Sequence, residues 1–162
     1  MDPIAITVGT FHAGTRFNII AGEAELTGTT RCFDPDIWAV IDQHIARVAE
    51  KIGEAHRCEV KVSYNKMTPP VMNDPELADL AAKSVLKVAG AEGLASIEKT
   101  PGGEDFAYFA NEVPSMFAFI GAANPEKFEA MPHHHECFQI DEDCIELGAA
   151  MYAQYAVDFL DQ

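Results

Sequence analysis

The stretch DPDIWAVIDQHIARVAEKIG, residues 34–53, is the clearest folding signal in the sequence. Asp34 is a typical helix-capping residue, Pro35 suits a first helical position, and Gly53 suits a helix end. Between them the apolar side chains recur at helical spacing, at Ile37, Ile41, Ile45, Val48 and Ile52. The pattern predicts an amphipathic helix with one apolar face.

The segments on either side of this helix have the period of two that is typical of a strand with one buried face. Apolar residues alternate with small or polar ones over residues 4–9, and a weaker alternating segment follows over 24–31. After the helix, Cys58–Tyr64 alternates in the same way. Residues 4–66 are therefore predicted to form strand, strand, helix and strand, which is an α+β arrangement.

A stiff connector, Thr68-Pro69-Pro70, follows these elements. Proline cannot donate a hydrogen bond to a strand ladder, so the connector predicts a domain boundary. We expect one domain over residues 1–70 and a second over 71–162.

The second region has the pattern of an α/β domain. Its first helix is predicted to be capped by Asn73 or Asp74, with Pro75 in the first turn, and to end at Gly90. The apolar run over 115–121 fits a strand covered on both faces. The other expected elements are a short strand at 95–99, a short helix within 103–109 and a terminal helix that opens at 141–143.

Composition excludes several functional classes. Lys and Arg number 11 against 26 Asp and Glu, a formal net charge of -15. Such a field repels phosphate backbones and anionic lipids, so neither nucleic acid nor a membrane is an expected partner. No apolar run reaches the roughly 18–20 residues of a membrane-spanning helix, and the start has no secretory pattern. We therefore expect a cytoplasmic protein.

Three of the six histidines stand together, as His133, His134 and His135, shortly before the expected terminal helix. Neutral imidazole is the commonest metal ligand in proteins. Adjacent side chains point in different directions, so at most one or two of the three can face one ion. A solvated surface cluster explains this motif equally well when it is considered alone.

Two further motifs could bind a ligand that carries a carboxylate. Arg31 and Asn18 could hold it through charge-assisted hydrogen bonds. Gly103 could let backbone N–H groups approach a ligand, and Glu104 follows it directly. Both motifs also have an ordinary structural explanation, since loop side chains often tie the backbone and acidic residues favour a helix N-terminus.

Taken in order, four short motifs resemble the carboxyl-terminal part of the zinc-dependent amidohydrolases that include hippurate hydrolase, aminoacylases, indole-acetyl-amino-acid hydrolases and carboxypeptidase G. The motifs are Gly14-Thr15 to Asn18-Ile19-Ile20, Gly28-Thr29-Thr30-Arg31, Gly103-Glu104-Asp105-Phe106, and His134 four residues before Phe138 with Ile140-Asp141-Glu142 following. The sequence departs from the family at Ala21, where proline is usual, and at Pro101, in a region where methionine is common. Neither departure affects a residue with an assigned role.

The resemblance implies a fold class. Residues 1–70 would be the later part of a ferredoxin-like α+β lid, incomplete here, of the kind that usually dimerises. Residues 71–162 would be the returning half of the α/β catalytic domain of a zinc hydrolase.

The resemblance also implies roles for individual residues. His134 would be a metal ligand, with a register ambiguity of one because His133 and His135 flank it. Asn18 and Arg31 would grip the carboxylate of an N-acyl amino acid. The substrate pocket would be lined by Gly103 and Glu104.

In such a family the other metal ligands and the general-base glutamate lie in a segment that precedes the lid, so no catalytic base is assigned in this sequence. We expect a portion of an amidohydrolase that cleaves N-acyl or N-aminoacyl amide bonds of small carboxylates and is inactive alone. Its expected partners are a second copy or a separate amino-terminal chain. The alternatives are a noncatalytic assembly or binding module derived from the fold, and adventitious metal binding by the histidine cluster.

Overall fold

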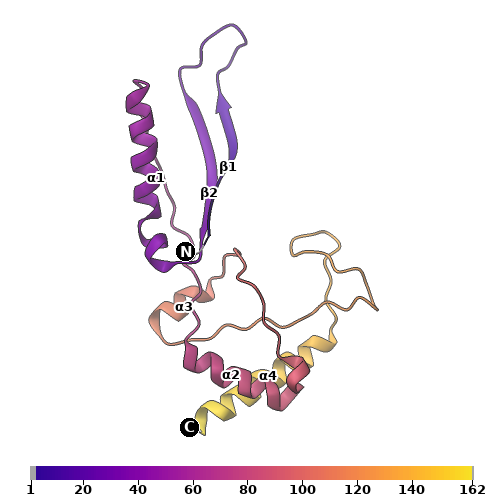
Figure 1. The fold of residues 1–162 in the computed structure, drawn as a ribbon. Helices are drawn as coiled ribbons and strands as arrows, with labels where there is room; N and C mark the ends of the chain where they lie inside the picture. The colour runs from indigo at the N-terminus through magenta and orange to yellow at the C-terminus, as the bar shows by residue number, and fades with distance from the viewer. Residues whose placement is uncertain (1–2, 162) are drawn as a thin grey trace. The chain divides into compact units, whose positions relative to one another are not determined.

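The computed structural model describes residues 3–161, which form a mixed α/β structure (Figure 1). In chain order the elements are β1 (Ile4–Ala13), β2 (Ala24–Cys32), α1 (Pro35–Ala55), α2 (Pro75–Ala89), the 3₁₀-helix η1 (Ala91–Gly93), α3 (Phe106–Glu112) and α4 (Asp143–Leu160). The chain divides into two compact units, Met1–Val71 with Lys99–Tyr108, and Met72–Glu98 with Phe109–Gln162.

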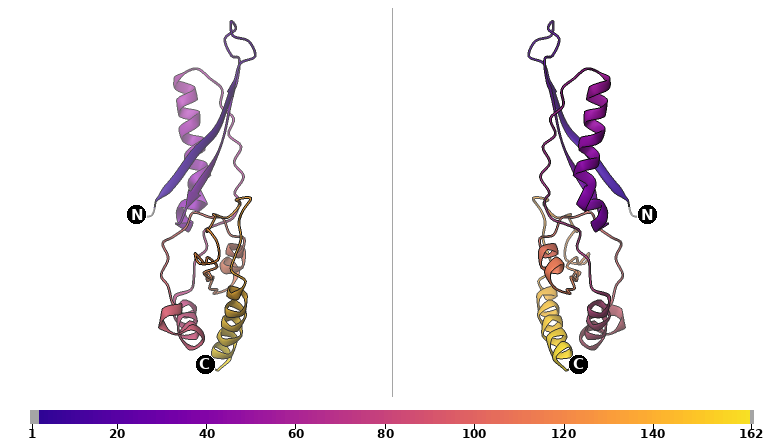
Figure 2. Two further views of the ribbon diagram at one scale, coloured as in Figure 1. Left: turned by 90° about the vertical axis from the view of Figure 1, so that its right-hand side faces the viewer. Right: turned by 90° about the vertical axis from the view of Figure 1, so that its left-hand side faces the viewer.

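Strands β1 and β2 form the long antiparallel hairpin of the first unit (Figures 1 and 2). Their register shifts by one residue between Val8 and Thr10. Without this bulge Phe11 would face the side opposite to Val8, because side chains alternate along a strand. With it, Phe11 pairs with Leu26 and shares the face of Val8. The bulge thus keeps one apolar face along the hairpin and leaves a threonine-rich polar face behind it.

The apolar face of the hairpin is largely uncovered within residues 3–161. Phe11 is 64% exposed, and Ile6, Val8 and Leu26 are exposed as well. A soluble protein rarely leaves a continuous apolar face of this kind open to water.

Helix α1 confirms the prediction made from residues 34–53. The Asp34 carboxylate accepts hydrogen bonds from the backbone N–H groups of Asp36, at 2.8 Å, and Ile37, at 3.3 Å, as an N-cap does. The helix packs against the extended segment 58–66. A methyl group built on Gly53 would lie 2.3 Å from Cγ2 of Val60, so the two backbones approach closely at this glycine.

The far end of segment 58–66 is tied to α1 by Lys66. Its ammonium donates to the Ala39 carbonyl oxygen at 2.6 Å and pairs with the Asp42 carboxylate at 2.9 Å. The same ammonium lies over the Trp38 ring, 5.4 Å from its centroid. Lys66 also holds the pKa of Asp42 below its usual value through their hydrogen bond.

The predicted strands at 58–64, 95–99 and 115–121 are wrong for residues 3–161, in which only β1 and β2 are strands. Side chains from Val60 to Thr68 still alternate between half-buried and exposed. A strand needs a ladder partner as well as a suitable side-chain pattern, and within the described chain these segments have none. The run at 115–121 is also not covered on both faces, since Phe119 is 62% exposed.

A side chain replaces a strand partner beside the 115–121 segment. The Asn73 amide donates to the Phe117 carbonyl oxygen at 3.0 Å and accepts from the Phe117 N–H at 2.8 Å. The Asp74 N–H donates to the Ser115 carbonyl oxygen at 2.8 Å. These contacts satisfy backbone groups that a neighbouring strand would otherwise pair.

The second unit is built on the packing of α2 against α4, which confirms both predicted helices. Asp74 caps α2, as expected for one of the two candidates. Ser84, fully buried between the helices, donates to the Asp158 carboxylate at 2.7 Å, and Lys87 pairs with that carboxylate at 2.6 Å. Lys87 accordingly holds the pKa of Asp158 below its usual value.

The close approach at Gly53 gives a stability prediction. In Gly53→Ala the new methyl group would overlap Val60, and overpacking costs about 1–3 kcal/mol. Helix propensity returns less than about 1 kcal/mol. We expect the free energy of unfolding to fall by about 1–2 kcal/mol in urea denaturation.

Gly22→Ala is the matched control, because a methyl group there meets no atom within 4 Å. It should leave the free energy of unfolding unchanged or slightly higher. A Gly53→Ala protein as stable as the native one would contradict the described packing of α1 on residue 60.

Candidate functional site

The three adjacent histidines lie in the His loop, defined here as residues 128–140, an irregular and mostly exposed segment before α4. His134 has φ of 69°, in the left-handed region that an L-residue with a side chain seldom adopts. Such residues persist where the surrounding structure enforces them, and they cluster at functional sites. The backbone at His134 is therefore the strained point of the loop.

The three imidazoles have different surroundings. The His133 ring packs against the Phe138 ring, with centroids 4.8 Å apart. The Cys137 N–H donates to Nδ1 of His135 at 3.1 Å, so the neutral His135 ring carries its proton on Nε2 and offers no free lone pair. Within residues 3–161 the His134 ring makes no hydrogen bond. His134 is thus the one imidazole of the three with neither a hydrogen bond nor a ring contact among the described residues.

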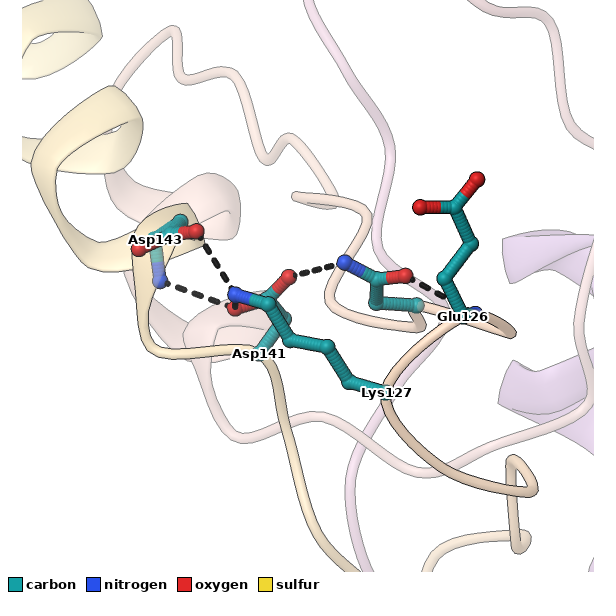
Figure 3. Close-up of polar contacts among 5 residues, drawn as sticks. Glu126, Lys127, Asp141 and Asp143 are labelled. Carbon is teal, nitrogen blue, oxygen red and sulfur yellow. Dashed lines mark hydrogen bonds and ion pairs between the residues drawn. The ribbon is translucent and has the colours of Figure 1, made fainter.

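Both ends of the His loop are tied to the Asp141 carboxylate (Figure 3). The Asn124 amide donates to Asp141 Oδ2 at 2.6 Å, and Lys127 Nζ donates to Oδ1 at 2.7 Å. Lys127 also donates to the Asp143 carboxylate at 2.8 Å, while the Asp143 N–H donates to Asp141 at 3.3 Å. We call Asn124, Lys127, Asp141 and Asp143 the Asp141 clamp.

The Asp141 clamp was not predicted from the sequence. Asp141 was assigned only to a motif and to the start of a helix, and Asn124 and Lys127 received no role. The contacts join residues 14 and 17 positions apart through an irregular loop. The only local signal was a lysine in a strongly acidic chain, which does not specify a partner.

The first unit brings together two of the residues predicted to bind substrate. Arg31 Nη1 donates to the Pro101 carbonyl oxygen at 3.2 Å. A methyl group built on Gly103 would lie 3.7 Å from that Nη1 and 3.0 Å from Thr68 Oγ1. Arg31 therefore lies beside the backbone of the glycine motif, where a guanidinium and peptide groups can meet one ligand.

Glu104 has a local structural contact. Its carboxylate accepts a hydrogen bond from the Phe106 N–H at 3.1 Å, at the start of α3. This is the capping role that acidic residues commonly have at a helix N-terminus. The side chain is half-buried and lies next to Gly103 in the chain.

Asn18 is not brought to Arg31 within the first unit. Arg31 pairs with Ala5, while Asn18 lies in the loop that joins Ala13 to Ala24 at the other end of the hairpin. Arg31 and Ala24 are seven residues apart on β2, which is about 24 Å of strand. The length of the hairpin therefore separates the two predicted carboxylate-binding residues.

The described residues do not form a complete metal site. Over residues 3–161 no three His, Cys, Asp or Glu side chains gather closely enough to hold an ion. His134 fits as a single imidazole ligand, and it belongs to the second unit, whereas Arg31, Gly103 and Glu104 belong to the first. No helix of the described chain has the length and apolar character needed to cross a membrane.

Comparison with known proteins settles the family. The family model described as peptidase family M20/M25/M40 matches residues 3–158. This chain belongs to that family. The resemblance inferred from the four motifs is thereby confirmed.

Individual relatives give the same result for this M20 chain. It is 32% identical over 161 residues to thermostable carboxypeptidase 2 of Saccharolobus solfataricus, covering 98% of this chain and 40% of that protein. It is 28% identical to N-acetylcysteine deacetylase of Bacillus subtilis, covering 96% and 39%. An IAA-amino acid hydrolase of Arabidopsis thaliana is 29% identical, with 99% and 37% covered. The chain spans about two fifths of the length of these relatives.

A solved structure matches the fold as well. The chain superposes with a TM-score of 0.84 on a dinuclear metal-binding M20 peptidase of Bacillus subtilis, at 27% identity, covering 98% of this chain and 42% of that one. The mixed α/β architecture, with its two-stranded sheet and four α-helices among the described residues, is therefore an M20 fold. The finer division into lid and catalytic half stays a prediction.

The Asp141 clamp gives a pH prediction. Hydrogen bonds from Lys127 and Asn124 lower the pKa of Asp141 to about 2. An unperturbed aspartate titrates near 3.9, so the clamp's contribution to stability is fully present above about pH 4 and is lost as the pH falls through about 2. An NMR titration of the Asp141 carboxyl carbon should show the low midpoint.

The variant Lys127→Met removes the first cause of this shift. The Asp141 midpoint should then move up toward the ordinary value. An unchanged midpoint in Lys127→Met would contradict the described contact between the two side chains.

Proposed function

We propose that this chain is the carboxyl-terminal part of a metal-dependent amidohydrolase that cleaves N-acyl or N-aminoacyl amide bonds of small carboxylate substrates. The observation that carries the proposal is the M20 match over residues 3–158. The names of the relatives support the substrate class, since they refer to carboxypeptidases, an N-acetylcysteine deacetylase and IAA-amino acid hydrolases.

In this proposal the second unit supplies His134 as one ligand of the metal, which we take to be zinc. When bound, such a metal polarises the amide carbonyl and lowers the pKa of a bound water. The remaining ligands and the general-base glutamate would come from protein outside these 162 residues. The free imidazole of His134, beside the engaged rings of His133 and His135, supports this assignment.

The first unit would bind the substrate carboxylate. A guanidinium can hold a carboxylate through two parallel charge-assisted hydrogen bonds. The Pro101 carbonyl oxygen fixes one end of the Arg31 fork beside Gly103, which supports a shared role for this pair. Glu104 would line the same pocket through its position after Gly103. Asn18, at the other end of the hairpin, would not contact the carboxylate that Arg31 of the same chain binds.

The apolar face of the hairpin supports the idea that this chain is part of a larger assembly, because its side chains are exposed among the described residues. Protein that covered this surface and paired the extended segments would complete an incomplete lid over residues 1–70 and a returning catalytic half over 71–162.

The partners follow from the same proposal. We infer a small N-acyl amino acid as substrate, a second copy or an amino-terminal chain as protein partner, and a cytoplasmic location. The chain has 26 acidic and 11 basic residues, and this negative charge supports the exclusion of nucleic acid and anionic membranes as partners. The alternative is a noncatalytic assembly module built on the same fold.

Hydrolytic activity distinguishes the amidohydrolase from the noncatalytic assembly module. The chain alone should not hydrolyse N-acyl amino acids, because a catalytic zinc normally has three protein ligands. When this chain replaces the matching two fifths of thermostable carboxypeptidase 2, the hybrid should hydrolyse N-acyl amino acids. A metal chelator should abolish that hydrolysis. Turnover by the chain alone, or a folded and metal-loaded hybrid without turnover, would contradict the proposal.

Substitution of the histidines in that hybrid tests the ligand assignment. A bound metal contributes several kcal/mol to transition-state stabilisation, and each 1.4 kcal/mol is about tenfold in rate. His134→Ala should therefore lower kcat/KM by about 100-fold or more. His133→Ala and His135→Ala are the matched controls and should retain most of the activity. Equal losses of activity in all three variants, or no loss in His134→Ala, would contradict the ligand assignment. The histidine cluster would then be a solvated surface feature.

A further inference from the structure

The His loop has few internal contacts to define its shape. Its side chains from Pro132 to Ile140 are all exposed. The described backbone hydrogen bonds inside it run from the His135 N–H to the Pro132 carbonyl oxygen, at 3.2 Å, and from the Phe138 N–H to the His135 carbonyl oxygen, at 3.0 Å. A loop with so little burial depends on how its two ends are held.

The Asp141 clamp holds both ends (Figure 3). On the incoming side, Asn124 and Lys127 donate to the Asp141 carboxylate at 2.6 and 2.7 Å. On the outgoing side, the Asp141 N–H donates to the Ala122 carbonyl oxygen at 2.8 Å. The Asp141 side chain is only 14% exposed although Lys127 is 50% exposed, so water reaches the carboxylate poorly.

The strained residue of the loop lies between these two ends. His134 keeps its left-handed backbone, with φ of 69°, in a segment that has no burial to enforce it. An L-residue holds such a conformation only where its surroundings impose it. The hydrogen bond from the His135 N–H to the Pro132 carbonyl oxygen closes a turn around His134, and the clamp fixes the chain on either side of that turn.

We propose that Lys127 and Asp141, with Asn124, are positioning residues that close the His loop and thereby hold His134 in the conformation in which it binds metal. The inference rests on the proposed function, since it treats His134 as a ligand. None of the three residues contacts the metal in this account. They act through the loop ends, in the way that outer contacts orient a ligating histidine elsewhere.

The matched control is Lys87, which forms an ion pair of the same kind in the same unit. Lys87 Nζ lies 2.6 Å from Asp158 Oδ1, against 2.7 Å from Lys127 to Asp141. The two lysines are also similarly exposed, at 56% and 50%. The Lys87 pair joins α2 to α4 and holds no end of the His loop.

The first arm of the test uses hydrogen–deuterium exchange on the 162-residue chain without metal. Lys127→Met should raise the exchange rates of the hydrogen-bonded amides of Phe128, His135, Phe138 and Asp141 by about tenfold or more, because the loop ends separate. Lys127→Arg, which keeps the charge and the donors, should restore slow exchange. Lys87→Met should leave exchange in the loop unchanged even if it raises exchange in α2 and α4.

The second arm measures Co²⁺ affinity, by visible absorption, in the complex of this chain with the segment that supplies the other ligands. Lys127→Met should weaken Co²⁺ binding by about tenfold, the lower end of the range for groups that contact a ligating histidine directly, because Lys127 acts only through the loop ends. Lys127→Arg should restore the affinity, and Lys87→Met should not change it.

The outcomes separate the two proposals. If the native complex binds Co²⁺ but Lys127→Met binds it equally well, the positioning role is overturned and the proposed function stands. If affinity falls in Lys127→Met without faster exchange in the loop, the positioning role is also overturned. If the native complex binds no Co²⁺, the proposed function fails, and the inference fails with it.

Discussion

The Asp141 carboxylate accepts hydrogen bonds from Asn124, from Lys127 and from the backbone of Asp143, so one side chain fixes the ends of the His loop and the first turn of α4. Charge-assisted contacts around a poorly solvated carboxylate are among the stronger polar interactions in proteins. The loop itself buries almost nothing, so this carboxylate fixes the chain on either side of the Pro132–His135 turn that contains His134. The geometry of the proposed metal ligand thus depends on residues that never meet the metal.

In the first unit as well, structural contacts position a residue to which the proposal gives a binding role. The bulge between Val8 and Thr10 gives the hairpin one apolar face and one polar face, and Arg31 lies on the polar side near the helix end of the hairpin. There the Pro101 carbonyl oxygen holds the guanidinium beside Gly103. Asn18 lies beyond the other end of the same hairpin. The proposed contacts of Arg31 and Asn18 with a carboxylate are therefore not made side by side within this unit.

Helices were predictable from the sequence because their signals are local. Asp34 caps α1 as predicted, and Asp74, one of the two predicted candidates, caps α2. Three of the expected strands did not form within residues 3–161, because a ladder depends on a partner that alternation in one segment cannot specify. The Asp141 clamp was missed for the same reason, since its contacts cross an irregular loop. The difference between His134 and His135 required the hydrogen bond from Cys137, which fixes the tautomer of one ring.

The central claim is that this M20 chain contributes one imidazole, that of His134, to the metal centre of an amidohydrolase. A crystal structure of the zinc-loaded complex of this chain with its complementary segment, with zinc located by anomalous scattering, tests the claim most directly. The account predicts a His134 ring nitrogen at about 2.0–2.1 Å from zinc, with His133 still against Phe138 and His135 still bonded to the Cys137 N–H. Zinc bound by His133 or His135, or by no residue of this chain, would contradict it.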